Sequence, residues 1–248
     1  MRYYLSRIFN KRNVMGERKF GLDSSLFLLT LVILVITVLL PIVMIVYRTF
    51  FVGFKLDWKL FTTTIVAKEN LSAIYNTIRI AFFVTVFGTI VGLFYAWLIG
   101  RSDIPMKGLM RGLFTIPYMF PPFFGAMAWS LMLSPRSGYV NKLFMQITNS
   151  TNPLFNINSI AGIVFVEVCY YFPFVFLQVV SALERMDPTL EESARIAGAG
   201  QWYVIRKITL PLVLPAIAAG SMLILISSLS HFGVPAILGV SNNIFTLP

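Results

Sequence analysis

Ser228, Ser230 and His231, in the stretch SSLSHFG, are the residues whose types could support nucleophilic catalysis. Adjacent residues on a helix do not face each other, so Ser228, three positions before His231, is the better candidate nucleophile. The stretch offers no obvious oxyanion donor. An intramembrane hydrolase therefore stays only as an alternative function, and we expect His231 to be a structural histidine with its hydrogen bonds satisfied.

Glu167 is the one carboxylate inside a long apolar run. An ionisable group in such a run usually faces the interior of a helix bundle, a partner or a solute path. Two interpretations stay open. Glu167 borders a translocation path together with Tyr170 and Tyr171, or it is a protonated or hydrogen-bonded residue that holds two helices together.

The elements that position these residues follow from composition. The chain has 248 residues, of which 57% are apolar and 12% charged, whereas about a quarter of residues are charged in soluble domains. A membrane span needs about 20 mostly apolar residues. Runs of this kind occupy residues 24–47, 80–100, 112–135, 159–183 and the stretch after Lys207. We expect an all-α polytopic membrane protein with about five spans.

Basic residues set the expected orientation in the membrane. Thirteen Lys and Arg residues precede the first run or lie between runs two and three and between runs four and five, and seven lie on the other side. The side with the excess is normally cytoplasmic. We therefore expect a multi-pass protein of the cell membrane with a cytoplasmic N-terminus. Because these charges flank apolar runs, the net charge of +10 does not indicate nucleic-acid binding.

The segment between the fourth and fifth runs is charged, with four carboxylates and four basic side chains between Glu184 and Lys207. Asp187 followed by Pro188 predicts a helix start, and Gly198 predicts its break. Small residues on one face would allow a partner backbone to approach closely, and Glu191 is expected on the exposed side with Glu192. Docking to a protein fits this pattern better than a helix lying on lipid, which would favour bulky apolar residues.

The same segment resembles the signature E-A-A-x3-G-x9-I-x-L-P of the membrane subunits of binding-protein-dependent (type I) ABC importers. Glu192, Ser193, Ala194 and Gly198 match its first part, with Ser193 in place of Ala, and Ile208, Leu210 and Pro211 match the second. The resemblance implies a coupling helix seated on an ATPase. The docking residues that we expect are Leu190, Glu191, Glu192, Ser193, Ala194, Gly198, Ile208, Leu210 and Pro211.

The resemblance also implies partners and a domain plan. The sequence contains no G-x-x-x-x-G-K-[ST], so ATP and Mg are expected on separate nucleotide-binding subunits. A second permease subunit or fused half and an extracytoplasmic solute-binding protein complete the expected assembly. Residues 1–24 form the N-terminal cytoplasmic segment, and residues 25–248 form the transmembrane permease domain with its coupling loop at 184–211. No cofactor or metal site is expected in this chain, whose one cysteine is Cys169.

The stretches IPYMFPPFFGAMAW and HFGVPAILG look most like the ferric-iron group of this family. Ferric iron is therefore the predicted solute, with phosphonate, polyamine or sulfate as alternatives. Family members of the ferric type are often two fused halves of six helices each, so we expect a sixth span to be missing or truncated here. A purely structural or sensory membrane subunit is the remaining alternative.

Overall fold

The computed structural model describes residues 22–52, 55–56 and 58–247. The chain divides into two compact units, which meet in sequence at Val66 and Ala67. Residues 1–21 of the predicted N-terminal segment lie outside the described residues.

The first unit is built on one long apolar helix, α2 (Leu22–Phe50). Strands β1 (Phe51–Val52) and β2 (Lys55–Leu56) pair antiparallel after it, and helix α3 (Trp58–Val66) follows. Phe50 contacts the ring of Trp58 at a centroid distance of 5.2 Å and that of Phe61 at 5.0 Å. These aromatic contacts hold the end of α2 against α3.

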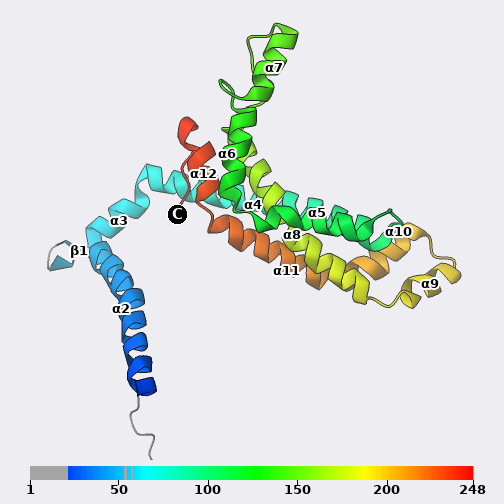
Figure 1. The fold of residues 1–248 in the computed structure, drawn as a ribbon, viewed down its shortest axis with the longest axis horizontal. Coiled ribbons are helices and arrows are strands. Elements are labelled where there is room, and N and C mark those ends of the chain that lie inside the picture. Colours follow the sequence, from blue (N-terminus) through cyan, green and yellow to red (C-terminus); the bar gives the residue numbers. More distant parts are fainter. Residues whose placement is uncertain (1–21, 53–54, 57, 248) are drawn as a thin grey trace, which may run out of the picture. The chain divides into compact units, whose positions relative to one another are not determined.

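The regular secondary structure of the second unit's described residues is entirely helical, with loops between the helices (Figure 1). Its elements are α4 (Lys68–Arg101), α5 (Lys107–Met119), α6 (Pro122–Leu133), α7 (Tyr139–Thr148), α8 (Ile160–Arg185), α9 (Thr189–Ile196), α10 (Gln201–Val204), the π-helical turn η2 (Ile205–Thr209), α11 (Leu210–Leu229), α12 (Gly233–Leu238) and the 3-10 turn η3 (Val240–Asn242).

Four of the five predicted spans are continuous helices long and apolar enough to cross a membrane: α2, α4, α8 and the helix that runs from Gln201 to Leu229. Helix α4 begins at Lys68, well before the predicted start at Ile80. The helix continues through polar residues and through Arg79, which lie outside the charge-free run that predicted this span.

The predicted third span, residues 112–135, is not a single straight helix. Helices α5 and α6 are bent by 94° at the break between them. Proline disfavours the helical conformation in the residue before it, and Phe120, which precedes Pro121, is extended at φ −104° and ψ 139°. The two consecutive prolines Pro121 and Pro122 therefore turn the predicted span into a broken one.

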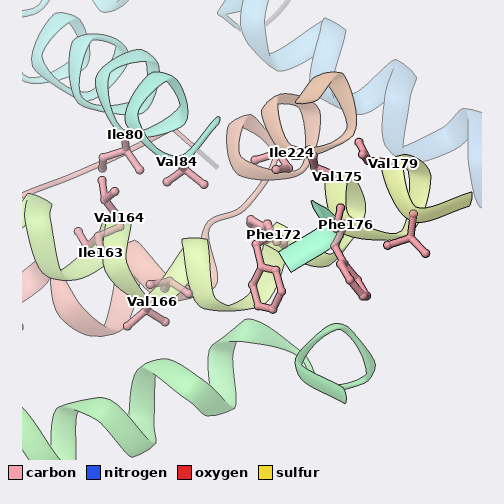
Figure 2. Close-up of a cluster of buried hydrophobic side chains, with 14 of the residues drawn as sticks. Ile80, Val84, Ile163, Val164, Val166, Phe172, Val175, Phe176, Val179 and Ile224 are labelled. Carbon is pink, nitrogen blue, oxygen red and sulfur yellow. The ribbon is translucent and has the colours of Figure 1, made fainter. Parts of the chain in front are cut away.

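Helices α4, α8 and α11 lie side by side and form the core of the second unit (Figure 1). Helix α8 is central, because 61% of its most apolar stretch is buried, against 28% in α4 and 22% in the helix that includes α11. Figure 2 shows that side chains of the three helices belong to one buried cluster, in which Val175 of α8 lies near Ile224 of α11, and Val84 of α4 lies on the side of Val164.

Glycines allow the three backbones to approach closely at the middle of α8. A Cβ atom on Gly92 of α4 would lie 2.7 Å from the carbonyl oxygen of Phe172 and 2.9 Å from Cβ of Val175. A Cβ atom on Gly220 of α11 would lie 2.6 Å from Cα of Val175. Small residues at such crossings bring membrane helices into van der Waals contact.

We predict that Gly92→Ala destabilises the purified protein by about 1–3 kcal/mol, as overpacking of a close contact does. The expected fall in Tm is about 2–4 °C for each kcal/mol. Gly112→Ala is the matched control, because a Cβ atom there would meet nothing within 4 Å. Thermal unfolding in detergent measures both variants, and an equal Tm for the two would contradict the tight crossing.

Candidate functional site

The loop between α8 and α11 has the predicted helix and the predicted break. The carboxylate of Asp187 accepts a hydrogen bond from the backbone N–H of Thr189 at 3.0 Å, and this bond lowers the pKa of Asp187. Helix α9 starts at Thr189 and ends at Ile196. Gly198 follows with φ +88°, in the left-handed region that favours glycine.

The exposed surface of this loop carries large apolar side chains. Leu190 is 45% exposed, Ile196 88%, Trp202 73% and Tyr203 58%. The polar side chains of Glu192 and Ser193 are also exposed, and they lie in α9 with Leu190 and Ile196. We name Leu190, Glu192, Ser193, Ile196, Trp202 and Tyr203 together the loop surface.

Sequence reasoning placed Leu190, Glu192 and Ser193 on this surface but missed Ile196, Trp202 and Tyr203. These three bulky apolar residues in a charged segment were the available signal, and their exposure contradicts the expectation of a docking face made of small residues. The remaining predicted docking residues lie at the base of the loop, where Ala194 and Ile208 are half-buried and Leu210 and Pro211 are exposed.

The expectation that Glu191 is exposed was wrong. Glu191 is only 7% exposed. Its Oε1 atom accepts hydrogen bonds from Oγ1 of Thr209 at 2.7 Å and from Nε of Arg101 at 3.1 Å. Glu191 was expected to be exposed because it adjoins Glu192 in the sequence. It faces inward because α9 packs against η2 and because Arg101 of α4 bonds to its carboxylate.

A second polar group lies inside the helix bundle. Glu167 is fully buried in α8, and its Oε2 atom accepts a hydrogen bond at 2.5 Å from Oγ of Ser228 in α11. This bond joins two spanning helices, which favours the interpretation that Glu167 holds helices together. The Oε1 atom of Glu167 is buried without a hydrogen-bond partner among the described residues.

His231 differs from the expectation of a satisfied histidine. Its Nε2 atom is buried and has no hydrogen-bond partner within the described part of the chain. The imidazole packs edge-on against the ring of Tyr171, with 6.0 Å between centroids. Since the hydroxyl of Ser228 contacts Glu167 and not the imidazole, the geometry does not support a serine–histidine pair.

Tyr170 and Tyr171 line a cavity of about 290 Å³ at the break between α5 and α6. Tyr118, Phe120 and Pro121 form other parts of its wall. Glu167, the third predicted path residue, does not line this cavity. It bonds to Ser228 instead.

The chain is similar to known membrane transport proteins. A family model described as binding-protein-dependent transport system inner membrane component matches residues 88–247. The chain is 31% identical over 170 residues to the molybdenum transport system permease protein ModB of Escherichia coli K12, covering 68% of this chain and 72% of that protein. It is 25% identical over 224 residues to the sulfate transport system permease protein CysW of Synechocystis, covering 90% and 78%.

A further relative is the putative 2-aminoethylphosphonate transport system permease protein PhnU of Salmonella typhimurium, 26% identical over 189 residues, with 76% of this chain and 65% of that protein covered. Among solved structures, a bacterial ABC transporter involved in the import of the acidic polysaccharide alginate superposes with a TM-score of 0.68 at 23% identity, covering 88% of this chain and 77% of that one. The predicted all-helical membrane fold is thus confirmed.

We predict that Ser228→Ala lowers the stability of the purified protein by about 1–3 kcal/mol, because it leaves a buried carboxyl oxygen of Glu167 without its partner. Ser230→Ala is the control, since Ser230 is exposed at the end of the same helix. Thermal unfolding in detergent measures the difference. An unchanged Tm for Ser228→Ala would show that this hydrogen bond does not hold α8 to α11.

Proposed function

Because this chain belongs to the family of binding-protein-dependent transport system inner membrane components, it is an inner-membrane permease subunit of an ABC importer, and we propose that its loop surface docks on a separate ATPase subunit and that its solute is an oxyanion. The exposed helix α9 with its glycine turn is the observation that carries the docking proposal.

The chemistry of the loop surface supports docking to a protein. Ile196 and Trp202 are exposed apolar side chains, and Glu192 provides an exposed charge one helical turn before Ile196. An apolar centre with a polar rim is the usual composition of a protein interface. The excess of Lys and Arg on the side of this loop and of the N-terminus supports a cytoplasmic location for both, where ATP is available.

The expected assembly contains two ATPase subunits, a second permease subunit or fused half, and an external solute-binding protein. A related solved structure is described as a bacterial alginate ABC transporter in complex with an alginate pentasaccharide-bound periplasmic protein. Its fold likeness to this chain, with a TM-score of 0.65, supports a similar mode of delivery here.

Two observations support an oxyanion as the solute. The relatives described above are named for molybdenum, sulfate and 2-aminoethylphosphonate transport. In neutral water, molybdenum exists as the oxyanion molybdate. The cavity at the α5–α6 break is lined by Tyr118, Tyr170 and Tyr171, whose hydroxyls can donate hydrogen bonds to anionic oxygens. Broken helices that line a cavity are common at the solute sites of transporters.

We predict that Gly198→Ala weakens ATPase binding by about five- to thirtyfold, because a non-glycine residue in the left-handed region costs about 1–2 kcal/mol. Gly200→Ala is the matched control, since Gly200 has φ −65° and an added Cβ atom would meet nothing within 4 Å at either glycine. Co-purification of the ATPase with each membrane subunit measures the effect. Equal recovery with both variants would argue against docking through this turn.

The solute is tested by uptake of radiolabelled sulfate, molybdate and ferric iron into cells that express the permease with its ATPase and binding protein. We expect ATP-dependent uptake of sulfate or molybdate, inhibited by an excess of either unlabelled anion. Uptake of ferric iron alone would instead support the prediction from the stretches IPYMFPPFFGAMAW and HFGVPAILG.

A further inference from the structure

We propose that the carboxylate of Glu191, held by Arg101 and Thr209, is the link that transmits movement of the docked helix α9 to the spanning helices α4 and α11. This inference rests on the proposed function, since α9 must first bind an ATPase. Glu191 and Arg101 are therefore assigned as positioning residues, which contact neither the solute nor ATP.

One carboxyl oxygen connects three elements. Glu191 lies in the first turn of α9, Arg101 is the last residue of α4, and Thr209 is the last residue of η2, directly before α11. The Oε1 atom of Glu191 lies 3.1 Å from Nε of Arg101 and 2.7 Å from Oγ1 of Thr209. A displacement of α9 must therefore move α4 and α11 or break these bonds.

Glu191 also attaches α9 to the rest of the unit. It is the one buried residue among the eight of this helix, while Leu190, Glu192 and Ile196 point outward. Hydrogen bonds between charged groups are roughly twice as strong as those between neutral groups. The bond between Glu191 and Arg101 is thus a charge-assisted contact between α9 and the helix bundle.

The two partners of Glu191 are themselves held in place. The Nη1 atom of Arg101 donates to the carbonyl oxygen of Leu183, in the last turn of α8, at 3.3 Å. Thr209 is fully buried at the end of a π-helical turn, in which the N–H of Leu210 bonds to the carbonyl of Ile205. Such wide turns are frequent at functional sites. The guanidinium and the hydroxyl therefore meet Glu191 from fixed directions.

A nearby ion pair provides the contrast. Arg111 of α5 and Glu184 of α8 lie 2.6 Å apart, but their side chains are 38% and 50% exposed. Exposed pairs contribute about 0–1 kcal/mol. This pair does not include a residue of α9, so its loss should not affect transmission.

The test compares Glu191→Gln and Arg101→Gln with the control Arg111→Gln in proteoliposomes that contain the ATPase, the binding protein and labelled sulfate or molybdate. We measure ATPase recovered with the membrane subunit, the stimulation of ATP hydrolysis by solute-loaded binding protein, and solute transported per ATP. For the two link variants we expect normal ATPase recovery and a fall of about fivefold or more in stimulation, the lower end of typical allosteric coupling. Arg111→Gln should behave as wild type.

Exchange of the two charges in Arg101→Glu/Glu191→Arg should restore part of the stimulation, which a purely local packing defect would not do. Thr209→Val, which removes one hydroxyl and keeps the ion pair, should reduce stimulation less than Glu191→Gln, and Thr209→Ser should retain it. If Glu191→Gln does not accumulate in the membrane, the two Thr209 variants provide the test of the link.

Stimulation and transport per ATP at the wild-type level in Glu191→Gln, or in Thr209→Val where the former does not accumulate, would overturn the link. Failure of the wild-type permease to retain an ATPase would overturn the proposed function instead. Loss of stimulation with retained ATPase supports the link alone, so the two failures are distinguishable.

Discussion

The close approach of α8 to both α4 and α11 is the contact on which the second unit depends. Gly92 and Gly220 place the neighbouring backbones against Val175 with no room for a further carbon atom. In a membrane, where lipid tails are as apolar as the side chains, such van der Waals contact replaces the hydrophobic driving force between helices. The approach brings the end of α4, with Arg101, beside the last turn of α8, where it contacts Leu183.

Polar contacts at that end of the bundle depend on this arrangement. Arg101 can reach the carbonyl of Leu183 and the carboxylate of Glu191 together only because α4 and α8 end at the same level. The loop then divides into a buried side, which is bonded to the bundle, and the exposed loop surface. This division suits an element that receives a partner on one side and is connected to spanning helices on the other.

A buried hydrogen bond and a cavity bring polar groups into the apolar helix bundle, and their surroundings differ. The bond between Glu167 and Ser228 is buried between α8 and α11, where a group without a partner would be costly. The cavity beside Tyr170 and Tyr171 lies instead at a helix break, where irregular backbone is tolerated because it lines a cavity. The bond that joins two helices and the cavity at the helix break thus lie at different positions on α8.

The sequence by itself determined the helical membrane class, the location of the apolar runs, the helix that begins just after Asp187 and the turn at Gly198, because apolar run length, capping and glycine conformation are local properties. Only the tertiary structure decided that Glu191 is buried and that Glu167 contacts Ser228. Arg101 and Glu191 are 90 residues apart in the chain. No periodicity or motif joins them, since their contact exists only once α4, α9 and η2 have packed together.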